Sequence, residues 1–143
     1  MARELFDRIP IRDVVSWNAM ISGYAQIGQF DEALSLFQEM RKAKATPDVS
    51  TLLSVLSVCA HLGALEIGNL VRSWIENHGH DSNLRIVNAL IDMYAKCGDL
   101  NMAWTLFESL QEKDIVSWNV MIGGYTHMSS YKKALEVFRT NAA

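Results

Sequence analysis

Residues Asp13 to Tyr24 read DVVSWNAMISGY, and residues Asp114 to Tyr125 read DIVSWNVMIGGY. The second stretch begins 101 residues after the first and repeats most of it in order. The similarity continues on both sides, since Leu5-Phe6 matches Leu106-Phe107 and Ala33-Leu34 matches Ala134-Leu135. Similarity at a fixed spacing is typical of repeat proteins. We therefore expect the chain to consist of copies of one structural unit.

The spacing of 101 residues divides into shorter units that share a glycine. The segments GYAQIGQFDEAL, VCAHLGALEIGN and MYAKCGDLNMAW align on Gly28, Gly63 and Gly98, which lie 35 residues apart. Working outward from these glycines predicts three complete repeats, a partial fourth repeat and the end of an earlier one. Their ranges are 14–48, 49–83, 84–114, 115–143 and 1–13, in that order.

Each predicted repeat contains the pattern of two amphipathic helices. Apolar side chains recur at the i, i+3, i+4 and i+7 positions of a helix, first at Trp17, Met20, Ile21 and Tyr24 and then at Ala33, Leu34, Phe37 and Met40. Gly28 is expected to end the first helix, and the turn at 46–48 follows the second. Because so short a helix pair cannot bury its apolar face alone, the pairs are expected to stack. The sequence thus predicts one all-α domain, a solenoid of helix-turn-helix repeats, whereas an ordinary helical bundle would need no repetition.

The composition is that of a globular protein without a general affinity for nucleic acid or membranes. Of the 143 residues, 50% are apolar and 20% are charged, and the formal net charge is −3. The longest stretch without charge, Val49 to Leu65, is shorter than the about 20 residues that span a bilayer, and we expect it to be a buried helix with a turn. Residues 1–13 mix acidic and basic side chains and lack the pattern of a signal or transit peptide.

No motif of an enzyme, a cofactor site or a metal site is found. Cys59 and Cys97 form no C-x-x-C pair and are expected to be reduced thiols in a helical core. The four histidines do not form a metal-binding pattern, and His78 and His80 are interpreted as polar loop residues. We therefore expect a non-catalytic protein without cofactors.

A second stripe runs along each first helix and is mostly small or polar. Its members are Val15, Asn18, Ser22 and Gln26; Ser50, Leu53, Ser57 and His61; Arg85, Asn88, Asp92 and Lys96; and Val116, Asn119, Gly123 and His127. A solvated face is the ordinary interpretation of such a stripe. Asparagine, however, is a mediocre helix former and recurs at one position in three repeats. Its carboxamide can read the edge of a nucleic-acid base, so the stacked stripes are also candidates for a binding groove.

Several segments resemble the motifs of one repeat family. VVSWNAMISGYAQIGQFDEALSLFQEM, LLSVLSVCAHLGALEIGNLV and IVNALIDMYAKCGDLNMAWTLFESL are similar to the standard, long and short repeats of plant pentatricopeptide repeat proteins, and ARELFDRIPIRD is similar to the end of a short repeat. The resemblance covers essentially the whole chain and implies a right-handed α-solenoid. It further suggests a chain of few repeats without the family's E or DYW domain, and no H-x-E and C-x-x-C deaminase signature is present.

The resemblance implies that the chain binds single-stranded RNA at one base per repeat. Carried over to this sequence, the base-reading residues are Asn18 with Asp48, Asn88 with Asp114, and Asn119. The Asn–Asp combination implies a preference for uracil, then cytosine. Val15, Arg85 and Val116 are expected to sandwich the bases, and Lys96 is expected to contact the RNA backbone. The resemblance also implies a location in the mitochondrion or chloroplast and a role in RNA editing or processing there.

The sequence departs from this pattern in places, and these departures support an alternative. Leu53 with Asn83 forms no good base-reading pair, Asn119 lacks its partner because the last repeat is partial, and Ser129 replaces the glycine of the other repeats. Leu53 is instead a candidate for a groove that binds a protein, either an organellar editing cofactor or a second copy of the chain. A homodimer through the uncapped ends of the solenoid, at residues 1–10 and 131–143, is a further expectation.

Overall fold

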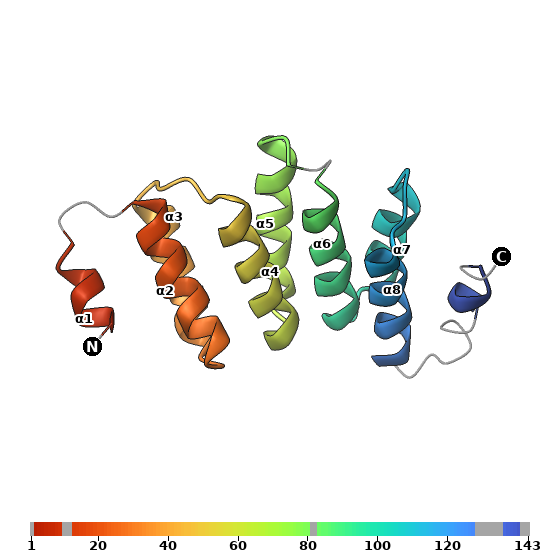
Figure 1. Ribbon diagram of the computed structural model, residues 1–143, viewed down its shortest axis with the longest axis horizontal. Coiled ribbons are helices and arrows are strands. Elements are labelled where there is room, and N and C mark those ends of the chain that lie inside the picture. Colours follow the sequence, from red (N-terminus) through yellow and green to blue (C-terminus); the bar gives the residue numbers. More distant parts are fainter. Residues whose placement is uncertain (1, 10–12, 81–82, 128–135, 141–143) are drawn as a thin grey trace. The chain divides into compact units, whose positions relative to one another are not determined.

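The computed structural model describes residues 2–9, 13–80, 83–127 and 136–140, and the regular structure in these ranges is helical, without strands. Eight helices are described there, and residues 136–140 are helical as well (Figure 1). In chain order the helices are α1 (Ala2–Asp7), α2 (Val14–Gln26), α3 (Phe30–Lys42), α4 (Val49–Leu62), α5 (Leu65–Asn77), α6 (Leu84–Lys96), α7 (Leu100–Ser109) and α8 (Ile115–His127). Ser129, where the sequence departs from the glycine pattern, lies outside the described residues.

Helices α2, α4, α6 and α8 share one way of beginning. The residue before each is an aspartate or asparagine, whose side chain accepts a hydrogen bond from a backbone N–H in the first turn. Asp13 accepts from Ser16, Asp48 from Thr51, Asn83 from Arg85 and Ile86, and Asp114 from Ser117. Such caps satisfy N–H groups that have no partner within the helix. The sequence therefore specifies these helix starts locally.

The ends of α2, α4 and α6 are equally local in origin. The expectation that glycines end these helices is confirmed, because Gly28, Gly63 and Gly98 have φ values of +80°, +67° and +91°. In this left-handed region a side chain would be strained, so glycine is favoured. The predicted buried helix and turn at 49–65 is also confirmed, as α4 followed by Gly63.

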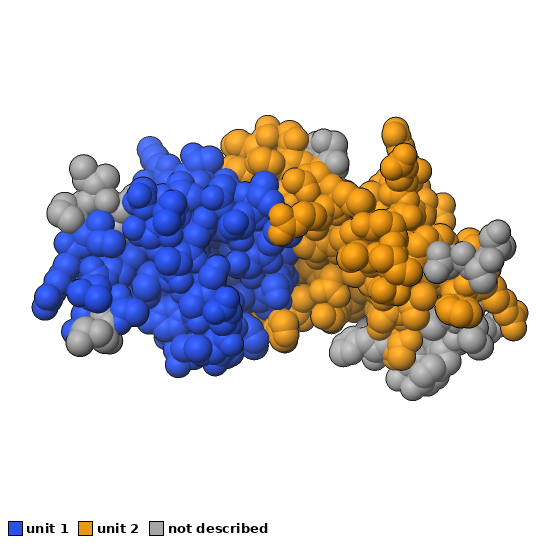
Figure 2. Space-filling model, viewed as in Figure 1, with its two compact units in different colours: residues 1–58 blue, residues 59–143 orange. Residues whose placement is uncertain are grey.

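The chain divides into two compact units, residues 1–58 and 59–143 (Figure 2). Helix α4 begins in the first unit and ends in the second. In the first unit, α2 and α3 pack side by side as an antiparallel pair (Figure 1). Of the predicted apolar stripes, Trp17, Ile21, Ala33, Phe37 and Met40 are buried, whereas Met20, Tyr24 and Leu34 are half-buried. Phe6 of α1 meets Trp17 edge to face, with 4.9 Å between the ring centroids.

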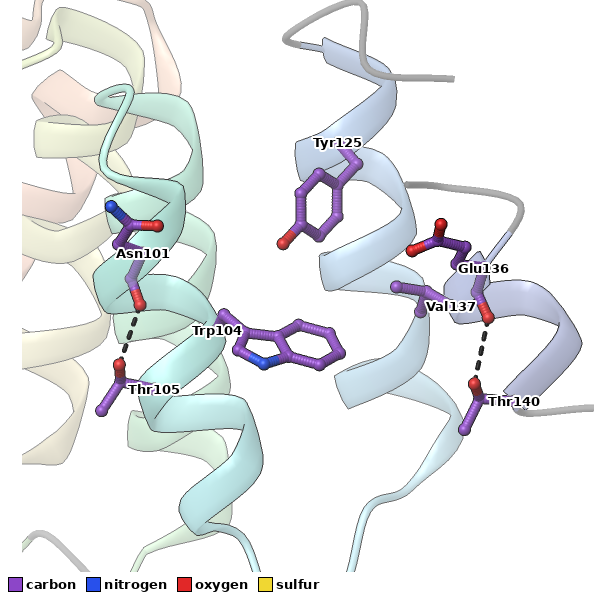
Figure 3. A pocket seen from close by; sticks show the side chains of 7 residues that line it. All are labelled: Asn101, Trp104, Thr105, Tyr125, Glu136, Val137 and Thr140. Atoms are coloured by element: carbon purple, nitrogen blue, oxygen red, sulfur yellow. Dashed lines mark hydrogen bonds between the residues drawn. The ribbon is translucent and has the colours of Figure 1, made fainter. Parts of the chain in front are cut away.

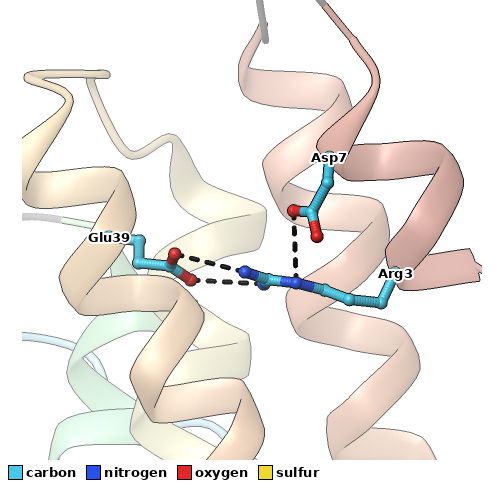
Figure 4. Close-up of polar contacts among 3 residues, drawn as sticks. All are labelled: Arg3, Asp7 and Glu39. Atoms are coloured by element: carbon cyan, nitrogen blue, oxygen red, sulfur yellow. Dashed lines mark hydrogen bonds and ion pairs between the residues drawn. The ribbon is translucent and has the colours of Figure 1, made fainter.

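A cluster of three charged residues also joins α1 to α3. The Arg3 guanidinium lies 3.2 Å from both carboxylate oxygens of Glu39, and its Nε lies 3.3 Å from Asp7 (Figure 4). The hydrogen bond to Glu39 is the main reason why the pKa of Arg3 is raised. Because the cluster is exposed to solvent, we expect it to orient α1 and to add little stability.

In the second unit, α6 is the central helix and packs against α5, α7 and α8. It is buried on several sides, including Ile86, Leu90, Ile91 and Tyr94. The Tyr94 hydroxyl donates a hydrogen bond to Asn69 of α5 over 2.6 Å. Gly124 of α8 lies against α6, because an added Cβ there would lie 2.6 Å from the Cβ of Ala95.

Both cysteines are free, as expected. Cys59 is buried, and this burial raises the pKa of its thiol to about 12. Cys97 is half-buried, and its Sγ lies 3.5 Å from the backbone oxygen of Cys59. The thiol of Cys59 therefore remains protonated and unreactive at neutral pH.

Candidate nucleic-acid interface

The first unit brings together three side chains around Asn18, which lies one turn into α2. The Asn18 Nδ2 donates a hydrogen bond to the Asp48 carboxylate over 2.9 Å. The Thr51 hydroxyl donates to the Asn18 Oδ1 and accepts a hydrogen bond from the backbone N–H of Asp48 over 3.1 Å. Asp48 thus caps α4 and holds the carboxamide of α2 at the same time.

The second unit contains the same arrangement around Asn88 of α6. The Asn88 Nδ2 lies 3.4 Å from the Asp114 carboxylate, and the Ser117 hydroxyl donates to the Asn88 Oδ1 over 2.8 Å. Asp114 caps α8 through the backbone N–H of Ser117 over 2.8 Å. We call the two groups, Asn18–Asp48–Thr51 and Asn88–Asp114–Ser117, the amide clusters.

The aspartates of the amide clusters are held in their charged form. Hydrogen bonds from the backbone and hydroxyl of Ser117, and to a lesser degree from Asn88, lower the pKa of Asp114 and outweigh the opposing effect of desolvation. Partial burial acts to raise the pKa of Asp48, but hydrogen bonds from Thr51 and Asn18 outweigh it and leave the pKa lowered. Both carboxylates are therefore acceptors well below neutral pH.

These lowered pKa values predict a dependence of stability on pH. A carboxylate with a lowered pKa stabilises the folded state above its ordinary value, here 3.8, and this contribution is lost as the pH falls through the folded-state value. We expect the urea midpoint of the wild type to fall more between pH 5 and pH 3 than that of the double variant Asp48→Asn, Asp114→Asn, in which the cap oxygens remain. Parallel decreases of the two midpoints would contradict this expectation.

The remaining predicted contact residues lie on the surface of the first helices. Val15 and Val116, expected to sandwich bases, are 73% and 49% exposed, and Arg85 and Asn119 are exposed too. The Lys96 ammonium forms an ion pair with Asp92 over 3.3 Å, so a phosphate would compete with this carboxylate.

Leu53 and Asn83, the predicted non-reading pair, have different surroundings. The half-buried Leu53 lines a hollow of about 380 Å³ in the first unit, together with Ser22, Ala25, Gln26, Ser54 and Ser57. Asn83 caps α6, and the residue at the place of Thr51 and Ser117 there is Ile86, which has no hydroxyl. No amide cluster can form around this pair.

Thr51 and Ser117 are the cluster members that reasoning from the sequence missed. The signal was present, because an aspartate is followed three residues later by serine or threonine at Asp13, Asp48 and Asp114. That spacing is also that of a helix cap, so it pointed to local structure only. The contact with an asparagine about 30 residues earlier in the chain is visible only in the structure.

Other features of the described residues carry no comparable polar arrangement. A hollow of about 520 Å³ lies between α7, α8 and residues 136–140, beside Trp104 and Tyr125 (Figure 3). Two of its hydroxyls, on Thr105 and Thr140, donate to backbone oxygens of their own helices. Within the described ranges, no group of three or more metal-binding side chains is assembled, and no helix is both long and apolar enough to cross a bilayer.

The helix pairs, with their recurring caps and glycine ends, define a class of protein, the α-helical repeat proteins. The model of the PPR repeat family matches residues 12–61, and the PPR repeat model matches residues 85–115 and 116–140. The chain belongs to the pentatricopeptide repeat family. This assignment agrees with the resemblance seen in the sequence.

Similar proteins from Arabidopsis thaliana extend the comparison. The chain is 58% identical over 102 residues to the chloroplastic pentatricopeptide repeat-containing protein At1g08070, and 44% identical over 137 residues to At4g30700. These alignments cover 71% and 96% of this chain. The chain spans 14% and 17% of the length of these relatives.

Solved structures confirm the fold class. The pentatricopeptide repeat protein PPR10, in complex with an 18-nt psaJ RNA element, matches 95% of this chain with a TM-score of 0.72 at 20% sequence identity. PPR10 from maize matches 94% with a TM-score of 0.68. The aligned chain corresponds to 21% and 20% of these structures. The predicted all-α solenoid of helix pairs is therefore the fold of this chain.

Proposed function

We propose that the chain binds single-stranded RNA and reads bases with Asn18 and Asn88, with uracil preferred over other bases. The observation that carries this proposal is the pair of amide clusters, which recur with the same chemistry in both units. Within its cluster, each carboxamide donates one N–H hydrogen bond and accepts one hydrogen bond at its oxygen. One N–H and one lone pair are left, which is the pair of groups needed to read a base edge.

The family supports the same proposal. A solved relative of the same fold is bound to an 18-nt RNA element. The residues that the family resemblance implies for base reading are the asparagines and aspartates that form the amide clusters. Because the net charge of the chain is −3, the attraction to RNA must come from local contacts rather than from overall charge.

The neighbouring side chains suit the stacking and backbone contacts of such an interface. We propose that Val15, Arg85 and Val116, one turn before the asparagines, cover the faces of the bases, that Asn119 reads a third base, and that Lys96 contacts a phosphate. Stacking contributes roughly 1–3 kcal/mol per base, against an association cost of at least about 4 kcal/mol. We therefore expect this chain alone to bind at micromolar concentrations or weaker.

We propose that the chain acts as a non-catalytic adaptor in RNA editing or processing in an organelle. Relatives named chloroplastic and mitochondrial support the location. The proposed repeats are 14–48, 49–83, 84–114 and 115–143, of standard, long, short and standard type, after the end of a short repeat at 1–13. The starts of α2, α4, α6 and α8 at Val14, Val49, Leu84 and Ile115 support this division.

The test is the binding of short labelled RNAs, oligo-U against oligo-A, followed by fluorescence anisotropy at low and moderate salt. We expect oligo-U to bind at least about tenfold more tightly, since each bidentate contact to a base contributes roughly 1–3 kcal/mol of discrimination. The double variant Asn18→Ala, Asn88→Ala should lose this preference.

The matched control for that test is Asn101→Ala, which removes an exposed asparagine from α7. It should bind as the wild type does, because it lies on a second helix, outside the polar stripes. If oligo-U and oligo-A bind equally, or if the double variant retains the preference, the amide clusters have no role in reading RNA.

Binding to a protein is the alternative function, and the hollow beside Leu53 favours it. An organellar editing cofactor or a second copy of this chain could insert an apolar side chain there, next to the small side chains of α2 and α4. Leu53→Glu should abolish such binding and leave the preference for uracil intact. A homodimer through the chain ends, residues 1–10 and 131–143, is a separate proposal, and residues 1, 10, 131–135 and 141–143 of these ends lie outside the described residues.

A further inference from the structure

Resting on the proposed RNA binding, we propose that the hydroxyls of Thr51 and Ser117 set the preference for uracil over cytosine. Each hydroxyl comes from the repeat that follows the reading asparagine. It acts as a positioning group that fixes which end of the carboxamide faces which part of the base.

The geometry of both hydroxyls suits this role. Ser117 is 0% and Thr51 1% exposed, so neither hydroxyl is available to RNA itself. The Ser117 Oγ lies 2.8 Å from the Asn88 Oδ1 and 2.9 Å from the Asp114 Oδ1. The Thr51 Oγ1 likewise has the Asn18 Oδ1 and, at 3.1 Å, the Asp48 Oδ1 within reach, and in both clusters the shorter contact is the one to the asparagine. The Thr51 oxygen also accepts a hydrogen bond from the backbone N–H of Asp48, over 3.1 Å.

The aspartate acts on the other end of the same carboxamide. The Nδ2 of Asn18 donates to Asp48, and the Nδ2 of Asn88 lies near Asp114. Turning the carboxamide over would place its oxygen against the carboxylate and would leave the oxygen without the hydroxyl donor. A buried polar atom that loses its partner is costly. The carboxylate and the hydroxyl together therefore favour one orientation.

The orientation of the carboxamide matters because uracil and cytosine carry their hydrogen-bond donor and acceptor in opposite order along the Watson–Crick edge. Uracil presents an N3–H donor beside the O4 acceptor, whereas cytosine presents an N3 acceptor beside the N4 amino donor. A carboxamide that offers an acceptor and a donor in fixed order matches one base, and the reversed carboxamide matches the other. When stacking holds the base in place, a locked carboxamide distinguishes the two pyrimidines.

Capping of the following helix is the simpler role for these hydroxyls. The chain contains a serine at an equivalent cap outside the amide clusters, and its replacement tests this simpler role. Ser16 occupies the same place after Asp13, which accepts from the Ser16 backbone N–H over 2.9 Å. Among the described residues, no hydrogen bond joins Asp13 to an asparagine of an earlier repeat. Ser16→Ala therefore removes the hydroxyl from a cap without touching an amide cluster.

The experiment compares RNAs that differ only in uracil or cytosine at the positions read, for the wild type, Thr51→Val, Ser117→Ala and Ser16→Ala. We expect the ratio of uracil to cytosine affinity to fall about twofold to tenfold for each cluster hydroxyl removed, the range that corresponds to one ordinary hydrogen bond. Ser16→Ala should leave the ratio unchanged. Ser117→Thr and Thr51→Ser keep a hydroxyl and should keep the ratio.

The outcomes separate this inference from the proposed function. If Thr51→Val and Ser117→Ala weaken binding of both pyrimidines equally, or leave the ratio as it is, the hydroxyls only cap helices and the inference is overturned, while RNA binding stands. If the wild type binds none of the RNAs, both proposals fail. Far-UV circular dichroism confirms that each variant is folded, and Thr51→Val, which conserves side-chain volume, gives a ratio even if Ser117→Ala does not fold.

Discussion

Replacement of Trp17 by alanine is expected to lower the free energy of unfolding by about 3–5 kcal/mol, the range observed for truncating a large buried aromatic side chain. Trp17 is only 2% exposed and is the largest fully buried side chain of the first unit. Its ring packs against the ring of Phe6, which is also buried. Small helical domains are stable by about 5–15 kcal/mol, so the loss is a large part of the total. Urea unfolding followed by far-UV circular dichroism measures it.

Trp104→Ala is the control for this prediction. Trp104 is 37% exposed and lies beside Phe107 and Tyr125 at the edge of the hollow between α7 and α8. Because much of its ring already contacts solvent, removing it should cost less than half as much as removing Trp17. Equal losses for the two variants would mean that Trp17 is not the centre of its core.

Gly124→Val is expected to destabilise the protein by about 2–3 kcal/mol. A Cβ at this position would lie 2.6 Å from the Cβ of Ala95, well inside van der Waals contact, and it would also meet Leu100 at 3.7 Å. Because the Cβ of Ala95 is fixed to the packed helix α6, α6 and α8 would have to separate, and overpacking of this kind costs about 1–3 kcal/mol or more. The difference in urea midpoint, at unchanged slope, gives the change in stability.

The equivalent glycine of the first repeat provides a matched control. Gly23 stands in the same motif, SGY against GGY, but a Cβ added there meets nothing within 4 Å. Gly23→Val should be nearly neutral, because valine is a slightly better helix former than glycine. If both variants lose the same stability, the contact with Ala95 does not explain the effect.

A third glycine shows why the kind of neighbour matters. A Cβ at Gly68 would meet the Sδ and Cε of Met93 at 2.5 and 2.6 Å, as close as the contact at Gly124. Those atoms are the flexible end of a methionine side chain, which can move aside. The close approach at Gly124 involves Ala95, whose Cβ is fixed to the backbone and has no such freedom.

The fold could be predicted from the sequence because its signals are local. The spacing of Trp17 and Ile21 indicates a helix and the face of it that is buried. The helix ends in a left-handed conformation at Gly28, which glycine adopts without strain. Asp13 and Asp114 mark helix starts through caps that involve residues only three positions away. Repetition of these signals was sufficient to predict stacked helix pairs.

The candidate site could be predicted only in part. Asn18 with Asp48 and Asn88 with Asp114 came from family resemblance, and the structure places each pair within hydrogen-bonding distance. The resemblance did not include Thr51 and Ser117, because their spacing from Asp48 and Asp114 has a sufficient local explanation as a helix cap. Their contacts with the asparagines cross from one repeat to the next.

The sequence by itself determined the helix pairs, their starts and ends, and which faces are apolar, because propensity, caps and periodicity act within a few residues of the chain. Only the tertiary structure decided what each equivalent position contacts. Gly23 and Gly124 have nearly the same local sequence, yet one faces open space and the other faces Ala95. The orientation of the Asn88 carboxamide likewise depends on Asp114 and Ser117, which are brought to it by helix packing. Packing joins residues that are distant in the chain, and no local pattern records those contacts.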